Sequence, residues 1–314
     1  MKFLVGRLEE AWLERLRKAA PEVELVVAED GEDAVRKVVD CEGAFNMHGP
    51  ELLRAGLKLR WIHVTLAGVD TVLYPDLVES DIVLTNGKRI QAIEIADHLF
   101  ALLLCFTRGV REFLPCQHEG RLGKPSRFPI YELNEMTILL IGFGGIGQEA
   151  ARRANSFRMR ILALDIEDTT KPDYVEYVGK ADEFHDLLSG ADFVASCVPL
   201  TAKSHRMIDA NALAAMKKSA YLINVSRGGV VDTDALVTAL ENNEIAGAAL
   251  DVTDPEPLPE DHPLWRMDNV IITPHIATRS HRIKERVIDL LCENLRRFAA
   301  NQPLLNIVNK QEGY

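Results

Sequence analysis

The chain has 314 residues, a length that suits two domains, and its content of 47% hydrophobic and 26% charged residues is typical of a globular enzyme. Its formal net charge of −11 argues against nucleic acid and anionic membrane surfaces as partners, because both require a basic face on the protein. The five cysteines are widely spaced without a C-x-x-C pair, which argues against a disulfide framework and predicts no bound metal. No apolar run is long enough to span a membrane, and charges follow the first six residues, so we expect a cytoplasmic protein without a signal peptide.

Short apolar runs alternate with helical patterns in the first part of the chain. An amphipathic helix is expected at residues 8–19, because Leu8, Trp12 and Leu16 fall on one face of it. Alternation of strands and helices is typical of parallel β/α units. The predicted strands are residues 2–5, 23–27, 43–45, 61–64 and 81–84.

Residues 93–110 are predicted to form one long, mostly apolar helix. The polar passage at 115–129, which contains glycine and proline, is interpreted as a connection across a domain surface. A final helix at 282–298 is expected to return to the first domain, so the second domain would be an insertion. Between the passage and the final helix we expect a helix at 146–157 and buried strands at 137–141, 160–164, 192–196, 220–225, 247–250 and 270–272.

A glycine-rich turn joins the predicted strand at 137–141 to the predicted helix that follows: Gly142-Phe143-Gly144-Gly145-Ile146-Gly147. The G-x-G-x-x-G pattern is weak by itself, but a strand before it and a helix after it are the context of a dinucleotide-binding turn. In such a turn Gly142 permits the tight bend, Gly144 lets the backbone approach a pyrophosphate, and Gly147 lets helix and strand pack closely. The N–H groups around Gly145 and Ile146 would supply donors at the positive end of the helix dipole.

Asp165 lies 18 residues after Gly147 (165 − 147), at the end of the next predicted strand. A carboxylate there accepts hydrogen bonds from the adenosine ribose and repels a 2′-phosphate, so the sequence favours NAD over NADP. The alternative is a turn and a strand-end carboxylate whose role is structural only.

Three later residues are catalytic candidates, each just beyond a predicted strand. Arg227 can bind a carboxylate through two charge-assisted hydrogen bonds. Glu256 lies between two prolines, which stiffen the backbone and fix where its carboxylate points. His275 is suited to general acid–base work, and a neighbouring carboxylate would hold its ring and favour the protonated form. Taken singly, Arg227 would form a surface ion pair, Glu256 would belong to an acidic loop, and His275 would be a structural histidine.

Taken together, these segments resemble the D-isomer-specific 2-hydroxyacid dehydrogenase family. The resemblance covers nearly the whole chain, is strongest at residues 137–276, and includes the glycine turn and the segments at 198–201, 226–228, 251–257 and 274–276. It implies an α/β fold of two doubly wound parallel-sheet domains. A Rossmann-type NAD domain, residues 101–282, would be inserted into a flavodoxin-like substrate domain, residues 1–100 and 283–314.

The family's Arg–Glu–His triad falls on Arg227, Glu256 and His275. The interval of 19 residues from Glu256 to His275 (275 − 256) suits the glyoxylate/hydroxypyruvate reductase branch. In that chemistry protonated His275 donates to the keto oxygen as hydride reaches C2, Arg227 holds the carboxylate, and Glu256 orients the His275 ring. The resemblance also implies contacts to the cofactor from Val198, Pro199, Val225, Ser226, Asp251 and His275, and contacts to the substrate from Arg227, His275 and the backbone of Ala67, Gly68 and Val69.

The chain departs from the family pattern at particular positions. Asp97 stands where many members have glutamate, and Arg158 stands where glycine is usual. His48 and His98 are interpreted as structural rather than catalytic. The resemblance implies a homodimer with its nucleotide domains in contact.

Two other functions stay open at this point: a NAD(H)-sensing regulatory protein on the same scaffold, and a formate-dehydrogenase-like enzyme. The spacing of the triad favours 2-hydroxyacid chemistry over the second, because carbonyl reduction needs a proton donor. The identity of the acid is undetermined, since glyoxylate, hydroxypyruvate, pyruvate and longer 2-keto acids share the α-keto carboxylate.

Overall fold

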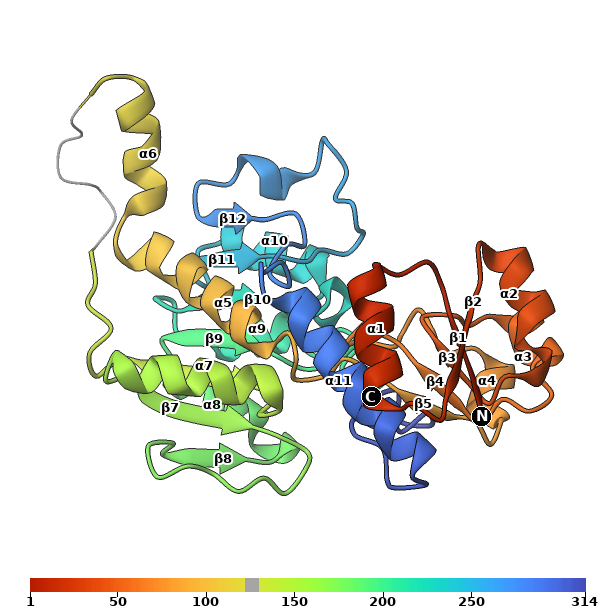
Figure 1. The fold of residues 1–314 in the computed structure, drawn as a ribbon. Helices are drawn as coiled ribbons and strands as arrows, with labels where there is room; N and C mark the ends of the chain where they lie inside the picture. The colour runs from red at the N-terminus through yellow and green to blue at the C-terminus, as the bar shows by residue number, and fades with distance from the viewer. Residues whose placement is uncertain (122–129) are drawn as a thin grey trace. The chain divides into compact units, whose positions relative to one another are not determined.

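The computed structural model describes residues 1–121 and 130–314 (Figure 1). The chain forms two compact units: Met1–Gln91 with Ser280–Tyr314, and Ala92–Arg279. The second unit is thus inserted into the first in sequence. Its ends, at 91/92 and 279/280, lie nine and three residues before the predicted boundaries at 100/101 and 282/283, and the whole of the long helix at Ala92–Thr107 belongs to it.

The first unit is built on a parallel sheet with strand order β2-β1-β3-β4-β5, which is the flavodoxin-like order. This arrangement confirms the predicted α/β class for the unit. Each predicted strand is present within two residues of its expected bounds. The strands are β1 (Lys2–Val5), β2 (Glu24–Val27), β3 (Gly43–Phe45), β4 (Trp61–His63) and β5 (Val83–Thr85).

Helices cover both faces of this sheet, because alternate strand residues point to opposite sides. Phe3 and Trp61 pack with α1 (Glu10–Ala19) and α11 (Ile283–Ala299). Leu4 and Ile62 lie in a second cluster on the other face. That cluster includes residues of α2 (Gly31–Lys37), α3 (Pro50–Ala55) and α4 (Pro75–Glu79).

The second unit is built on a parallel sheet with strand order β12-β11-β10-β9-β6-β7-β8. The order reverses between β6 and β9, and this switch point is where open α/β sheets bind ligands. Only the short β8 was not expected from the sequence. The strands are β6 (Thr137–Ile141), β7 (Arg160–Leu164), β8 (Tyr177–Gly179), β9 (Phe193–Ser196), β10 (Tyr221–Asn224), β11 (Gly247–Leu250) and β12 (Val270–Ile272).

This sheet is also covered on both faces. Ile138 and Leu140 of β6 pack with α5 (Ala92–Thr107) and α7 (Gly145–Ser156). Leu139 and Ile141 point the other way, into a cluster with residues of α8 (Phe184–Gly190), α9 (Ala210–Ala215) and α10 (Thr233–Glu241). The carboxyl ends of the parallel strands therefore lie at one edge, between two helical layers.

The prediction of one helix at 93–110 is wrong at its end. Gly109 adopts a left-handed φ of +65°, which ends the apolar helix α5 and starts α6 (Val110–His118). The passage predicted at 115–129 therefore begins inside a helix, while its residues 122–129 lie outside the described residues. The prediction of a loop relied on Pro115, but this proline lies inside α6.

Arg158, which stands where the family usually has glycine, has a φ of +57° just beyond the end of α7. Its N–H donates to the carbonyl of Asn155 at 2.9 Å, which caps the helix. A side chain in this conformation costs about 1 kcal/mol relative to glycine. The left-handed turn that ends α7 is therefore made here by an arginine.

None of the helices at residues 1–121 and 130–314 is both long enough and apolar enough to cross a bilayer.

Candidate active site

The glycine turn lies at the carboxyl end of β6, at the switch point of the second sheet. Gly142 has a φ of +96°, and a Cβ there would lie 2.9 Å from the backbone of Cys197 after β9. A Cβ on Gly147 would lie 2.2 Å from the Gly142 carbonyl oxygen. The packing of the chain on itself therefore requires glycine at both positions.

Gly144 differs from its neighbours, because a Cβ there would meet no protein atom within 4 Å. Gly144 is exposed and is the N-cap of α7, so the first N–H groups of the helix at Gly145 and Ile146 have no partner within the helix. Val198, whose Cγ1 lies 2.9 Å from the Cβ position of Gly142, borders the same turn. This arrangement fits a dinucleotide pyrophosphate held on backbone donors at the positive end of a helix dipole.

Asp165, after β7, is bound to the turn. Its Oδ2 accepts the Phe143 N–H at 2.6 Å and its Oδ1 accepts the Glu167 N–H at 2.9 Å. Each oxygen retains a second lone pair for a ribose hydroxyl. The carboxylate therefore fixes the glycine turn as well as marking the expected ribose site.

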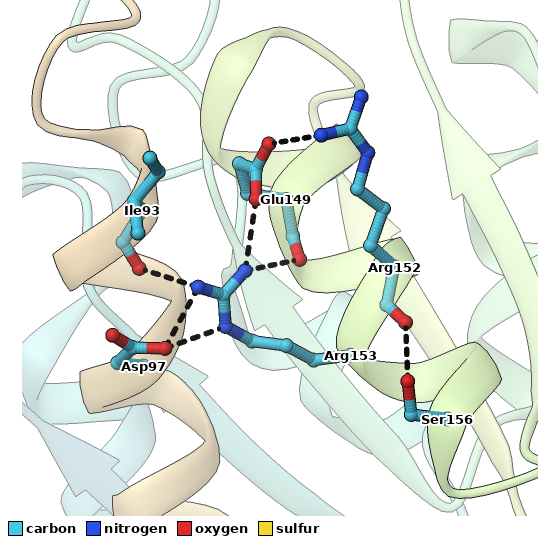
Figure 2. A network of polar contacts seen from close by, with 6 residues as sticks. All are labelled: Ile93, Asp97, Glu149, Arg152, Arg153 and Ser156. Carbon is cyan, nitrogen blue, oxygen red and sulfur yellow. Dashed lines mark hydrogen bonds and ion pairs between the residues drawn. The ribbon is translucent and has the colours of Figure 1, made fainter.

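Helix α7 is tied to α5 by one guanidinium (Figure 2). Arg153 of α7 donates from Nε to Asp97 Oδ1 at 2.7 Å and from Nη2 to the Ile93 carbonyl at 3.0 Å. Its Nη1 donates to the carbonyl and the carboxylate of Glu149. Asp97, the conservative departure from the family pattern, therefore joins the helix of the glycine turn to the first turns of α5.

The loop that carries Arg227 is shaped by a buried polar network. Asn224, at the end of β10, accepts the N–H and hydroxyl of Ser226 on Oδ1 and donates from Nδ2 to the Arg227 carbonyl at 2.9 Å. The Ser226 hydroxyl lies 2.7 Å from that of Ser196 at the end of β9. Arg227 Nη1 donates to the Ser226 carbonyl. Because Ser196, Asn224 and Ser226 are buried and bonded, the loop has one defined shape.

The loop of Arg227 packs directly on the loop that leads to Glu256. A Cβ on Gly228 would lie 1.9 Å from the Thr253 carbonyl oxygen, so only glycine permits this approach. The Thr233 hydroxyl adds a hydrogen bond to the Asp254 carbonyl at 2.7 Å. Arg227 and Glu256 therefore lie on two loops that are fixed against each other.

Glu256 and His275, which the family resemblance pairs, are in contact. His275 Nδ1 lies 2.7 Å from Glu256 Oε1, and the two side chains are 39% and 42% exposed. A carboxylate accepts, so Nδ1 carries the hydrogen and Nε2 is the ring atom available to another group. The pair is oriented and open, as a general acid–base requires.

His275 has a left-handed φ of +50°, and Asp251 holds this turn. The Asp251 carbonyl accepts the His275 N–H at 2.9 Å, and its carboxylate accepts the N–H groups of Ile276 and Ala277 at 3.0 and 2.9 Å. Three successive N–H groups are thus bound by one residue. Thr273 Oγ1 adds a hydrogen bond of 2.6 Å to Asp251 Oδ1.

The Asp251 carboxylate is almost wholly buried, with 1% of its side chain exposed. Burial by itself raises its pKa, but hydrogen bonds from His98, Thr273 and the backbone lower the pKa of Asp251 to about 2. The group is therefore ionised at neutral pH. The contact of Asp251 with the cofactor stays a prediction. In the structure Asp251 also binds the backbone of the His275 turn.

The remaining predicted residues are placed as follows. Val225 is buried in the core beside α5, and Pro199 is exposed after β9. The loop of Ala67, Gly68 and Val69 belongs to the first unit and follows β4. The Ala67 carbonyl accepts from Asn86 Nδ2 at 2.6 Å, so the loop is tied to the chain after β5.

Sequence reasoning assigned no role to Ser196, Asn224 or Thr273, and it read His98 as structural. Asn224, Thr273 and Ser196 lie at or just beyond strand ends, and this position was a signal that they could belong to the site. His98 lies within a helix and had no such signal, because its partner Thr273 is 175 residues away in the chain.

The site brings a glycine turn at a helix N-terminus and a hydrogen-bonded histidine–carboxylate pair to one edge of a parallel sheet, a combination that suits a nicotinamide-dependent oxidoreductase. The profile of "D-isomer specific 2-hydroxyacid dehydrogenase, NAD binding domain" matches residues 100–277. The chain is 36% identical over 287 residues to a glyoxylate reductase of Korarchaeum cryptofilum, covering 88% of this chain and 85% of that one. The chain therefore belongs to the D-isomer-specific 2-hydroxyacid dehydrogenase family and is an oxidoreductase.

Solved structures of the family have the same fold. A D-isomer specific 2-hydroxyacid dehydrogenase of Xanthobacter autotrophicus Py2, in complex with NADPH and MES, is 28% identical with a TM-score of 0.83, covering 99% of each chain. The NAD-complexed enzyme of Lactobacillus delbrueckii ssp. bulgaricus is 25% identical with a TM-score of 0.79, covering 98% of this chain and 100% of that one. Relatives thus bind either dinucleotide, so membership of the family does not by itself favour NAD over NADP.

A Gly228→Ala variant tests the packing of the loop of Arg227 on the loop that leads to Glu256. The added Cβ meets backbone, which cannot rotate away, so we expect a loss of about 1–3 kcal/mol in the free energy of unfolding. Thermal and urea unfolding measure it. The matched control is Gly144→Ala, whose Cβ has open space and whose stability should stay within about 0.5 kcal/mol of wild type. Equal stability of the two variants would contradict the loop packing described here.

Proposed function

We propose that this chain is a NAD-dependent reductase that converts a small 2-keto acid, such as glyoxylate or hydroxypyruvate, into the D-2-hydroxy acid. The observation that carries the proposal is the His275–Glu256 contact of 2.7 Å beside the loop of Arg227. The similar glyoxylate reductases support the choice of a small acid. This chain is also 31% identical over 295 residues to a D-3-phosphoglycerate dehydrogenase of Methanocaldococcus jannaschii, of whose length it covers 55%, so a larger acid is a second candidate.

When bound, the nicotinamide dinucleotide supplies the hydride that reaches C2 of the keto acid. His275 donates the accompanying proton from Nε2 to the keto oxygen, so the carbonyl becomes a hydroxyl. Glu256 keeps the proton on Nδ1 and stabilises the imidazolium before transfer. In the oxidising direction His275 Nε2 takes the proton back.

Arg227 binds the substrate carboxylate through its guanidinium, which offers paired donors in a planar fork. The N–H groups of Ala67, Gly68 and Val69 in the first unit are proposed to bind the same carboxylate. Val198, Pro199, Val225, Ser226, Asp251 and His275 are proposed to line the cofactor, with the pyrophosphate on Gly144, Gly145 and Ile146.

NAD rather than NADP is proposed because Asp165 stands at the ribose position. Glu167 and Asp168 add two further carboxylates to the same loop, although Lys180 pairs with Asp168 at 2.8 Å. A 2′-phosphate would therefore approach net negative charge, which lowers its affinity. A cytoplasmic location remains part of the proposal and is supported by the five free cysteines.

Assays with a panel of 2-keto acids test the function. We expect glyoxylate or hydroxypyruvate to give the highest kcat/KM with NADH, and NADPH to be poorer by about tenfold or more, since each repelled charge costs on the order of 1 kcal/mol. In Asp165→Ala the kcat/KM values with NADH and with NADPH should become more nearly equal. Binding of NADH without turnover of any 2-keto acid would instead favour the NAD(H)-sensing alternative.

His275→Ala should lose the proton donor while keeping the cofactor site. We expect turnover to fall by about 10²–10⁴-fold, the usual contribution of a general acid. The Kd for NADH, followed by its fluorescence, should stay near the wild-type value. Glu256→Gln is the companion variant and should lose less, because the ring remains in place. Full activity of His275→Ala would refute the role of His275.

A homodimer is also proposed, with α6 of the second unit in the contact. None of the residues of α6 is buried, and Val110, Phe113 and Leu114 are 41%, 37% and 50% exposed. Exposed apolar side chains grouped on one helix are typical of an interface. Light scattering should give twice the chain mass of 35.0 kDa, and Leu114→Lys should reduce it. A wild-type mass equal to one chain would rule the dimer out.

A further inference from the structure

His98 is notable among the histidines of the second unit, because it contacts Thr273 and Asp251, the residues that hold the turn of His275. It lies on α5, and 19% of its side chain is exposed. Its Nε2 lies 2.9 Å from Thr273 Oγ1 and 3.3 Å from Asp251 Oδ1. A residue of the first helix of the unit is thus joined to residues 153 and 175 positions later in the chain (251 − 98 and 273 − 98).

The direction of these hydrogen bonds follows from the available protons. The Thr273 hydroxyl has one hydrogen and lies 2.6 Å from the Asp251 carboxylate, which only accepts. Thr273 therefore donates to Asp251 and accepts from His98. Nε2 of His98 must carry a hydrogen, and it points at both oxygen atoms.

The network ends at the backbone of His275. Asp251 binds the N–H groups of His275, Ile276 and Ala277 with its carbonyl and its carboxylate. The left-handed φ of His275 costs about 1 kcal/mol or more, so the turn needs such anchors to persist. Loss of the His98 donor leaves Thr273 and Asp251 with a weakened, partly unsatisfied network.

Helix α5 is a firm base for this contact. Asp97, the residue before His98, accepts from Arg153 of α7, and Arg153 also binds the Ile93 carbonyl (Figure 2). Two neighbouring residues of α5 therefore reach the helix of the glycine turn on one side and the turn of His275 on the other.

We propose that His98 is a positioning residue for His275, acting through Thr273 and Asp251 rather than on the reacting atoms. This inference rests on the proposed function, since it assigns His275 the proton transfer. His98 holds the turn so that the His275 ring meets Glu256 and presents Nε2 in one orientation.

His98→Leu, His98→Gln and Thr273→Val test the proposal. Leucine fills space without a donor, glutamine restores an N–H donor, and valine keeps the shape of threonine without its hydroxyl. We expect kcat to fall by about 5- to 50-fold in His98→Leu, because small misplacements of a catalytic group cost up to about 10²-fold. The KM for the keto acid and the Kd for NADH should change by less than about twofold, and His98→Gln should recover most of kcat. Thr273→Val should change kcat in the same direction as His98→Leu.

The control is His185→Leu on α8, where the ring contacts Phe184 and lies outside the network. It should leave kcat unchanged. A His98→Leu enzyme with wild-type kcat, or a His98→Gln enzyme no better than His98→Leu, would overturn the proposal.

A second measurement does not depend on turnover. Hydrogen exchange of the amides at residues 275–277 should speed up in His98→Leu and Thr273→Val but not in His185→Leu. Unchanged exchange in both variants would overturn the proposed path. If wild type turns over no 2-keto acid, the proposed function fails, whereas the exchange result still decides whether His98 holds the turn.

Discussion

One buried carboxylate holds the turn of His275 in place. Asp251 binds three successive backbone N–H groups, the first of which belongs to His275, a residue in a left-handed conformation. An ionised group with 1% of its side chain exposed is tolerated only because His98, Thr273 and the backbone supply donors. The same contacts that offset the desolvation of Asp251 therefore shape the turn of His275.

The parallel sheet decides which loops meet. β10, β11 and β12 are neighbours, so the loops that follow them, with Arg227, Glu256 and His275, emerge at one edge. The switch point between β6 and β9 puts the glycine turn at that edge too. Close backbone contacts then fix these segments: Gly228 lies against Thr253, and Gly147 lies against Gly142.

Glycine is needed at the site for two different physical reasons. Gly142, Gly147 and Gly228 are required by contacts within the chain, so their replacement acts on folding. Gly144 meets nothing of the chain itself, and its lack of a side chain matters for what approaches the helix N-terminus. Figure 2 shows that this helix is also held from the side, because its Arg153 bonds to Asp97 and Ile93 of α5.

The sequence by itself determined the α/β class and nearly all the strands, because strand periodicity and turn residues are local signals, whereas the pairing of Glu256 with His275 came from the family resemblance. It misjudged the end of the long helix at Gly109 and missed β8, which has only three residues. Only the tertiary structure decided what holds the site: the joining of His98 to Thr273, of Ser196 to Ser226 and of Arg153 to Asp97. Such contacts between residues 30 to 175 positions apart leave no periodic trace in the chain, because they depend on how the strands and helices pack.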